Sequence, residues 1–272
     1  MNADDLVIGD DGLPLTEVGA WTLKKHERLI AYVNIARAVR QKFAKTETTY
    51  IELFSGPGRS IIKQDGRIIE GSPILAARTA KDQRVPFRDI HLADFEPSYV
   101  DAVRKRLPPN VGNIHSYVGA AETTVNRIAS SLNPDGLHFA FLDPFKLDPL
   151  PFSIIATLAN FKRMDMLIHV SIHDLQRNLR TYMEDGTLDR FAPGWRDIVN
   201  PQSPGKNVRI GIFQHWLGLI RNLDMAPSEG IEIVTGTNRQ PLYWLVLVAR
   251  HQLAHKFWNA IRNVTPQGRL GL

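Results

Sequence analysis

Apolar residues follow two different periods along this chain. Short runs rich in β-branched and aromatic residues, which are typical of strands, occur at Tyr50–Ser55, Ile90–Phe95, Asn113–Val118, His138–Asp143, Met166–Ser171, Ile231–Thr235 and Tyr243–Arg250. Apolar residues at helical spacing separate most of these runs, at Ile74–Ala80, Ser98–Leu107, Thr123–Ser131 and Phe152–Phe161. This alternation predicts a doubly wound α/β fold with a mostly parallel sheet of seven strands.

The last two predicted strands depart from this alternation. Only Gly236–Pro241 connects them, which is too short for a crossover helix, so we expect an antiparallel hairpin and an antiparallel last strand. At the other end of the chain, residues 1–49 predict a helical lead-in to the sheet. Its main element is an amphipathic helix over Thr22–Ala44.

Residues 173–228, between the fifth and sixth predicted strands, predict a mostly helical insertion. An insertion at this point lies above the carboxyl ends of the strands, where open α/β sheets bind ligands. We therefore expect a lid or a platform for a substrate. Among its arginines, Arg177 and Arg180 are candidates for contact with a substrate or partner.

The composition narrows the class of protein. At 272 residues, 43% of them apolar, the chain can bury one large core, and we expect a single domain over residues 1–272. It has no apolar run long enough to cross a bilayer, and its first residues lack the basic start of a secretion signal, so we expect a cytoplasmic protein without a membrane partner.

Cysteine is absent, which excludes disulfides, thiolate nucleophiles and iron–sulfur ligation. The net charge of +5 fits a DNA- or RNA-binding face and equally fits charge scattered over the surface.

A turn with two glycines follows the first predicted strand. The run Tyr50–Gly58 is an apolar strand that ends in such a turn, where small residues let the backbone approach a bound molecule closely. An ordinary strand–turn of an α/β protein is the alternative interpretation. The candidates for cofactor contact here are Glu52, Phe54, Ser55, Gly56 and Gly58.

The segment after this turn is patterned as a hairpin around Asp65-Gly66 and extends over Arg59–Glu70. The next helix is then expected to begin at Gly71-Ser72-Pro73, with Ser72 as its N-cap. Free N–H groups at that helix start would face the cofactor or an anionic substrate. The candidates for contact with a substrate or partner in this segment are Arg59, Ser60 and Ser72.

Acidic residues follow the second and third predicted strands. Asp94 ends the second strand, where the two oxygens of a carboxylate can accept hydrogen bonds from both hydroxyls of a ribose. Glu96, two residues later, is better suited to the N-terminus of the next helix. Glu122, after the third strand, is the candidate partner of an adenine amino group. We assign Asp94, Phe95 and Glu122 to the cofactor site.

The fourth predicted strand ends in Asp143-Pro144-Phe145. In amino-methyltransferases, Asp or Asn followed by two prolines and an aromatic residue accepts hydrogen bonds from the target amine and stacks on the base. The run in this chain has one proline and is one residue shorter. Two interpretations follow: Asp143, Pro144 and Phe145 are catalytic, or the aspartate shapes the turn and the phenylalanine packs.

Together these features resemble class I methyltransferases, which have a Rossmann-like fold and use S-adenosylmethionine (SAM). The strand plan matches theirs, and Glu52-Leu53-Phe54-Ser55-Gly56-Pro57-Gly58 resembles their acid-Leu-Phe-Ala/Ser-Gly-x-Gly run. The resemblance implies SAM or S-adenosylhomocysteine as the ligand. It implies contact of the methionine end with Glu52, of the ribose with Asp94 and of the adenine with Glu122.

More narrowly, the chain resembles the three-Cys-motif partner (TcmP-like) proteins of bacteria over nearly its whole length. The motifs that carry this resemblance are Tyr50–Ser60, Gly71–Pro73, Phe141–Phe145, Pro241–Leu245 and Trp258. It implies a partner protein with three clustered cysteines, similar to a radical-SAM iron–sulfur protein, and a role in DNA modification or DNA repair. The alternative is a non-catalytic subunit that binds nucleic acid or the iron–sulfur partner without methyl transfer.

Three other chemistries fit the residues less well. The first motif also resembles that of cytosine-C5 DNA methyltransferases, but their reaction needs a cysteine nucleophile, which this chain lacks. The antiparallel final hairpin disfavours a nicotinamide-dependent oxidoreductase. His169, His173 and Asp174 have a spacing that suits a metal ion, yet His169 belongs to a buried strand and no further ligand cluster follows. We therefore expect no metal site.

Overall fold

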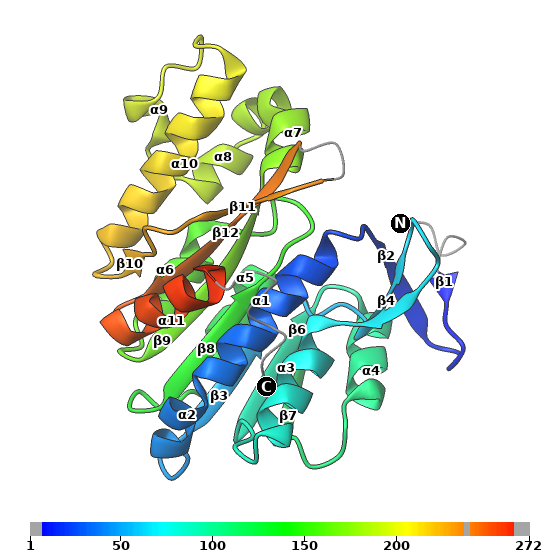
Figure 1. Ribbon diagram of the computed structural model, residues 1–272. Coiled ribbons are helices and arrows are strands. Elements are labelled where there is room, and N and C mark those ends of the chain that lie inside the picture. The colour runs from blue at the N-terminus through cyan, green and yellow to red at the C-terminus, as the bar shows by residue number, and fades with distance from the viewer. Residues whose placement is uncertain (1–6, 237–239, 264–272) are drawn as a thin grey trace.

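Two β-sheets form the framework of the computed structural model, which describes residues 7–236 and 240–263 (Figure 1). Among these residues, the larger sheet has eight strands: β3 (Thr48–Glu52), β6 (Asp89–Asp94), β7 (Asn113–Val118), β8 (Leu137–Leu142), β9 (Met164–Ser171), β10 (Ala226–Pro227), β11 (Glu232–Thr235) and β12 (Pro241–Ala249). The smaller sheet consists of β1 (Val7–Ile8), β2 (Pro14–Val18), β4 (Arg59–Ile62) and β5 (Ile68–Glu70).

The strand order of the larger sheet confirms the predicted fold class. The order is β7-β6-β3-β8-β9-β12, with β11 and β10 both paired to the far edge of β12. Strands β3, β6, β7, β8 and β9 are parallel, whereas β12 runs antiparallel to β9 and to β11. The chain therefore has the Rossmann-like fold of class I methyltransferases. The eighth strand is the short β10, whose two residues are too few to give a periodic signal.

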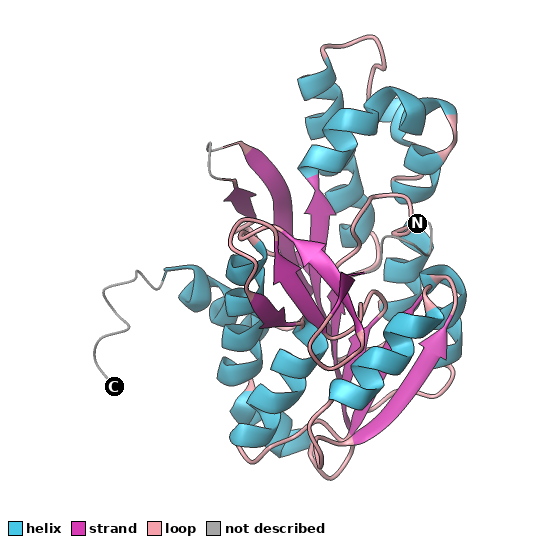
Figure 2. Cartoon of the chain, turned by 90° about the vertical axis from the view of Figure 1, so that its right-hand side faces the viewer, coloured by secondary structure: helices cyan, strands magenta, loops and turns pink. Residues whose placement is uncertain are grey.

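Helices cover both faces of the larger sheet (Figures 1 and 2). On one face lie α1 (Thr22–Ile35), α3 (Ser72–Asp82), α4 (Pro97–Arg106) and α11 (Gln252–Asn263), and on the other α5 (Ala121–Ala129) and α6 (Phe152–Leu158). Each face of the sheet carries its own buried apolar cluster, and successive residues of a strand contribute to one cluster and then to the other. In β12, Trp244 and Val246 belong to one buried cluster, while Leu245 and Leu247 belong to the other.

The first part of the chain holds more than the predicted helix. That helix is present but breaks at Ala36 into α1 and α2 (Arg37–Phe43). Ahead of it, β1 and β2 pair with each other, and β2 also pairs in parallel with β4. Neither β1 nor β2 was predicted. The hairpin expected over Arg59–Glu70 is confirmed as the antiparallel pair β4–β5.

Helix α1 also contacts the last part of the described chain. Arg28 donates to both carboxylate oxygens of Glu232, through Nε at 2.8 Å and Nη2 at 3.0 Å. Its Nη1 donates to the backbone oxygen of Ile261 at 2.8 Å. These bonds fasten α1 to β11 and α11, so α1 and the last helix of the described chain lie side by side (Figure 1).

The predicted insertion between β9 and β11 is mostly helical, and it also includes the short strand β10. It contains α7 (Ile172–Glu184), α8 (Thr187–Phe191), α9 (Trp195–Ile198) and α10 (Gly205–Arg221). Its aromatic residues join the core of the sheet: Phe213 stacks on Trp244 of β12 at 4.0 Å between ring centroids. Among the described residues, no helix combines the length and apolar character that crossing a bilayer requires.

Candidate functional site

The glycine turn follows β3 at the carboxyl edge of the larger sheet. Gly56 and Gly58 have φ angles of +56° and +83°, a left-handed conformation that glycine adopts readily. A Cβ on Gly58 would lie 3.1 Å from Cγ2 and 3.2 Å from Cα of Val103, so α4 leaves no room for a side chain there. At Gly56, no atom of the described chain beyond its neighbours lies within 4 Å of that position. This side of the turn is therefore open to a bound molecule.

Asp94 holds this turn from the neighbouring strand. The Gly56 N–H donates to Asp94 Oδ2 at 2.8 Å, and the Glu96 N–H donates to Oδ1 at 3.1 Å. Burial raises the pKa of Asp94 in spite of these hydrogen bonds. A carboxylate has about four acceptor positions, so this one retains capacity for the hydroxyls of a ribose. Phe95, the next residue, is 78% exposed.

Glu52 lies inside this edge of the sheet, with no exposed surface. Tyr50 Oη donates to Glu52 Oε2 at 2.6 Å, and Ser72 Oγ donates to Oε1. Burial raises the pKa of Glu52 well above its ordinary value, which favours the neutral acid. The prediction of Ser72 as the N-cap of α3 is wrong: Gly71 is the cap, and the Ser72 hydroxyl binds Glu52. The two bonds fasten the start of α3 to β3.

The other two residues of the turn are anchored to the sheet. Ser55 is buried, and its N–H donates to the backbone oxygen of Ala93 at 3.0 Å. Phe54 is half-buried and packs against the core that contains β9 and β12. Both contacts place the backbone of the turn beside the carboxyl end of β6.

A charged cluster lies where β8 ends. Lys25 Nζ, from α1, is 2.6 Å from Oδ1 and 2.5 Å from Oδ2 of Asp143. His169 Nδ1, from β9, is 3.3 Å from Asp143 Oδ1 and 3.1 Å from the backbone oxygen of Pro144. The side chains of Lys25, Asp143 and His169 are all at most 16% exposed. Three elements far apart in the sequence thus supply one buried polar cluster.

The charges within this cluster follow from its contacts. Burial opposes ionisation of Asp143, but the neighbouring Lys25 outweighs it and holds the pKa of Asp143 below its ordinary value. Burial and the charge of Lys25 lower the pKa of His169 to about 4. At neutral pH the cluster therefore holds one ion pair and one neutral imidazole. The Tyr243 ring covers it, 4.4 Å from the His169 ring and 5.8 Å from Lys25 Nζ.

The residues after Asp143 differ sharply in exposure. Pro144 is buried, whereas Phe145 is 85% exposed. Since Phe145 does not pack in the core, its ring is available to an incoming molecule. Asp143, one strand away from the glycine turn, lies at the same carboxyl edge, because β8 pairs in parallel with β3.

Glu122 and the two arginines of α7 lie on or near the insertion side. Glu122 accepts a hydrogen bond from Ser153 Oγ at 2.5 Å, and Arg190 of α8 lies 3.9 Å from its other oxygen. Arg177 and Arg180 are exposed on α7. Arg180 pairs with Glu184 on the same helix, at 3.0 Å.

Arg59 and Ser60 instead contact the small sheet. Arg59 Nη1 lies 2.7 Å from Asp10 and 3.2 Å from Asp11, both in the turn between β1 and β2. Ser60 Oγ shares a hydrogen bond of 2.8 Å with Thr16 Oγ1. These two candidates therefore join the segment after the glycine turn to the beginning of the chain.

Lys25 was missed as a site residue. It is in the first turn of the predicted helix, among other charged residues, and its role depends on where α1 lies over the sheet. One signal was present: Lys25, Leu29 and Val33 follow one another at intervals of four, so Lys25 occupies the apolar face of the helix. His26, beside it, is also buried, and burial together with Lys25 lowers its pKa to about 4.

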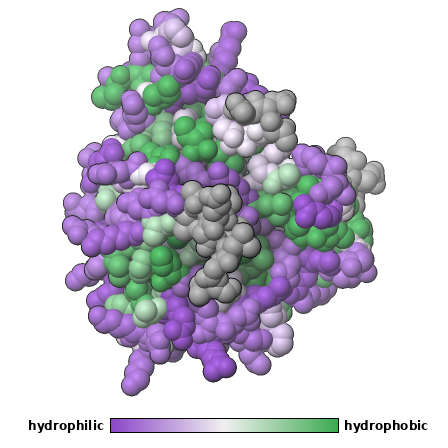
Figure 3. Space-filling model, in the orientation of Figure 1, coloured by the Kyte–Doolittle hydropathy of each residue, from purple (hydrophilic) through white to green (hydrophobic). Residues whose placement is uncertain are grey.

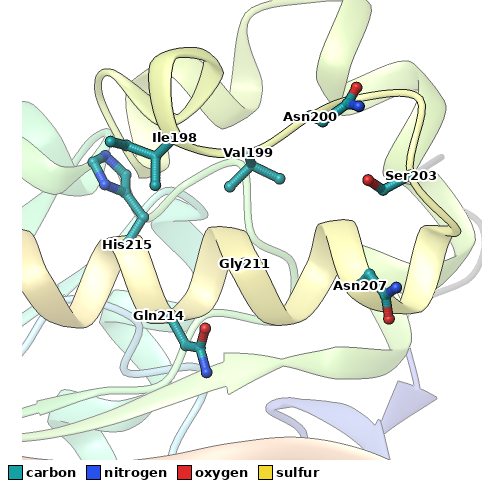
Figure 4. A pocket seen from close by; sticks show the side chains of 8 residues that line it. All are labelled: Ile198, Val199, Asn200, Ser203, Asn207, Gly211, Gln214 and His215. Carbon is teal, nitrogen blue, oxygen red and sulfur yellow. The ribbon is translucent and has the colours of Figure 1, made fainter.

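The insertion contains a polar cavity of about 420 Å³ between α9 and α10. Figure 4 shows Asn200, Ser203 and Asn207 at one end of it, Ile198 and His215 at the other, and Val199 between them. His215, also in its wall, lies with Nε2 2.7 Å from the backbone oxygen of Pro193. No charged residue of the described chain lines this cavity.

Comparison with known proteins supports the fold. No family model matches the sequence, and no curated protein sequence matches it at a significant level. A solved structure from Legionella pneumophila, assigned to the family model DUF519, is 12% identical with a TM-score of 0.53, and the match covers 90% of this chain and 93% of that chain. At this identity the likeness shows a shared fold.

Two solved methyltransferases are more distant. A SAM-dependent methyltransferase from Anabaena variabilis is 12% identical, with a TM-score of 0.38 over 88% of this chain and 98% of that chain. The plantazolicin methyltransferase BpumL, solved in complex with a pentazolic desmethylPZN analog and S-adenosylhomocysteine, is 10% identical, with a TM-score of 0.38 over 83% of this chain and 86% of that chain.

Proposed function

We propose that this chain binds SAM at the carboxyl ends of β3 and β6 and transfers its methyl group. The observation that carries the proposal is the hydrogen bond from the Gly56 N–H to Asp94. It brings together a glycine turn that is open on one side and a carboxylate that can still accept hydrogen bonds. SAM needs both: the open turn for its methionine end and the carboxylate for its ribose hydroxyls. Phe95, exposed beside Asp94, is suited to cover the adenine ring.

The remaining cofactor contacts come from the same edge. The backbone of Phe54, Ser55, Gly56 and Gly58 would face the methionine end. The buried Glu52 holds the turn in place through its hydrogen bond with Ser72 at the start of α3. Glu122, at the start of α5, would meet the adenine amino group. The same set accepts S-adenosylhomocysteine, which differs from SAM by the transferred methyl group.

The acceptor in this proposal docks beside Asp143, Pro144 and Phe145. The lone pair of an acceptor nitrogen attacks the methyl carbon, the carbon–sulfur bond breaks, and S-adenosylhomocysteine leaves with that electron pair. Asp143 orients the nitrogen by accepting a hydrogen bond. Because Lys25 holds its pKa low, Asp143 is a weak base, and the proton that the nitrogen loses passes to water.

We propose a nucleic acid as the acceptor, either DNA or RNA. Phe145, next to Asp143, is 85% exposed, and an exposed aromatic ring can stack on any of the bases. The net charge of +5 favours contact with phosphates. A role in DNA modification or repair, beside a radical-SAM partner with three clustered cysteines, rests on the TcmP-like resemblance alone.

Calorimetric titration with SAM and with S-adenosylhomocysteine tests the first step. We expect saturable binding of both, and loss of at least tenfold in affinity for Asp94→Ala. Transfer of a labelled methyl group from SAM to DNA, RNA or protein tests the second step. Asp143→Ala should abolish transfer while SAM affinity stays within threefold; absence of SAM binding at millimolar concentration rejects the proposal.

A non-catalytic subunit is the second candidate function. It is favoured by Lys25, whose Nζ lies within 2.6 Å of both oxygens of Asp143, where an acceptor amine would dock. This candidate predicts SAM binding without transfer to any acceptor, and binding of nucleic acid or the iron–sulfur partner that Asp143→Ala leaves unchanged. Transfer that depends on Asp143 excludes it.

A further inference from the structure

A second cavity lies at the opposite edge of the larger sheet. It has a volume of about 710 Å³ and lies between α1, α2 and α11, beside the first residues of β3 and β8. This volume is within the range of pockets that hold small molecules. Strands of five or six residues separate it from the carboxyl edge, a distance of roughly 20 Å. It is therefore distinct from the proposed cofactor site.

The walls of this cavity are mainly apolar. Aromatic and aliphatic side chains from both faces of the gap supply them: Val39, Phe43, Phe87, Phe139, Leu253 and Phe257. Figure 3 shows apolar residues on this part of the surface, between the positions of α2 and α11 in Figure 1. An apolar body, aromatic or acyl, would remove this surface from water.

Positive charge surrounds the cavity. Lys42 and Lys162 are exposed at its rim, and the Arg163 guanidinium lies 5.1 Å from the Phe43 ring centroid. Arg40 and Arg250 line it as well. Asp165 is the only acidic residue of the described chain in the wall, and burial raises its pKa to about 6. The field at the mouth therefore attracts an anion.

We propose that this cavity binds a small amphipathic anion. Its apolar body packs against Phe43, Phe139 and Phe257, and its acidic group meets Lys42 and Lys162. The inference does not depend on SAM binding or on methyl transfer.

Fluorescence titration with two dyes tests the chemical class. The first, 8-anilino-1-naphthalenesulfonate, has an aromatic body, an N–H and a sulfonate; the second, N-phenyl-1-naphthylamine, lacks only the sulfonate. We expect saturable binding of the sulfonate with one site per chain, and at least tenfold weaker binding of the neutral dye. Equal affinities overturn the anionic selectivity, and absence of saturable binding overturns the site.

Variants locate the bound dye. Ala36→Trp fills the cavity from the end of α1 and should weaken binding at least tenfold, and Lys162→Glu should weaken the sulfonate about fivefold but not the neutral dye. Lys206→Glu, which changes an exposed lysine on α10, is the matched control and should change the affinity for neither dye.

Near-ultraviolet circular dichroism verifies that each variant folds. If Ala36→Trp does not fold, the result for Lys162→Glu decides whether the dye binds in this cavity. Unchanged affinity in Lys162→Glu, or displacement of the dye by S-adenosylhomocysteine, overturns the proposal.

Discussion

Lys25 Nζ contacts both carboxylate oxygens of Asp143, at 2.6 and 2.5 Å, although 118 residues separate the two in the sequence. The lysine comes from the helix that precedes the sheet, and the aspartate ends a central strand. The proposed acceptor site therefore depends on α1 for its charge balance. A change in the position of α1 would alter Asp143 without any change in the sheet.

Lys25→Met should destabilise the protein by about 3 kcal/mol at neutral pH, because it leaves a buried, ionised Asp143 without its cation. Urea unfolding measures this loss. The double variant Lys25→Met, Asp143→Leu should recover most of it, since no buried charge remains. Arg180→Met is the control: it breaks the exposed pair with Glu184 and should cost less than about 0.5 kcal/mol. Similar losses for both single variants would contradict the account.

The glycines of the turn should respond differently to a methyl group. Gly58→Ala should destabilise the protein by about 3 kcal/mol. An alanine there is strained in the left-handed conformation, and its Cβ also lies too close to Val103. Gly56→Ala should lose only about 1–2 kcal/mol from strain, but its Cβ enters the open side of the turn and should weaken SAM binding at least tenfold.

Gly66→Ala is the matched control for Gly56→Ala. Gly66 has φ +69° and open space at its Cβ position, but it lies in the β4–β5 turn. It should show the same small loss of stability and an unchanged affinity for SAM by calorimetry. If Gly56→Ala binds SAM as the wild-type protein does, the cofactor is not seated on this turn.

Asp165→Asn should stabilise the protein at neutral pH. Burial raises the pKa of Asp165 from 3.8 to about 6, so the folded state favours the neutral acid. Stability from this group is fully present below about pH 4 and is lost as the pH rises through 6, by at most about 3 kcal/mol. The variant, which keeps an acceptor for the Tyr32 hydroxyl, should gain over the wild type between pH 4 and 7 in urea unfolding. A pH-independent difference would contradict this.

Phe145→Ala should leave stability within about 0.5 kcal/mol of the wild type, since the side chain is 85% exposed. If the ring stacks on a base, its loss should weaken binding of single-stranded nucleic acid about tenfold, measured by fluorescence anisotropy. Ile198→Ala, also exposed but on α9 of the insertion, should leave binding unchanged. Equal binding by both variants would exclude stacking on Phe145.

The central part of the fold was predictable because each parallel strand is long enough to show its period, and helices separate the strands. The small sheet was not. β1 has two residues, β2 fully buries only Leu15, and the parallel pairing of β2 with β4 joins positions about 44 residues apart. Such pairing is decided by tertiary contacts that no local period records.

The candidate site, too, was predictable from the sequence only in part. Asp94 ends β6 and Gly56 lies in the turn after β3, which is the parallel neighbour of β6, so the strand order brings the two residues close together. The partner of Asp143 did not, because it depends on how α1 lies across the sheet. Glu52 was assigned to the cofactor from its place in the motif, yet the side chain turns inward to Tyr50 and Ser72. A motif gives the order of residues but not the face on which each side chain lies.

The bonds from Arg28 to Glu232 and Ile261 also bear on how the protein is made. Arg28 leaves the ribosome 204 residues before Glu232 does. At about 5–20 residues per second, that interval lasts roughly 10–40 s. Throughout it, the side of α1 that contacts β11 and α11 lacks these native contacts.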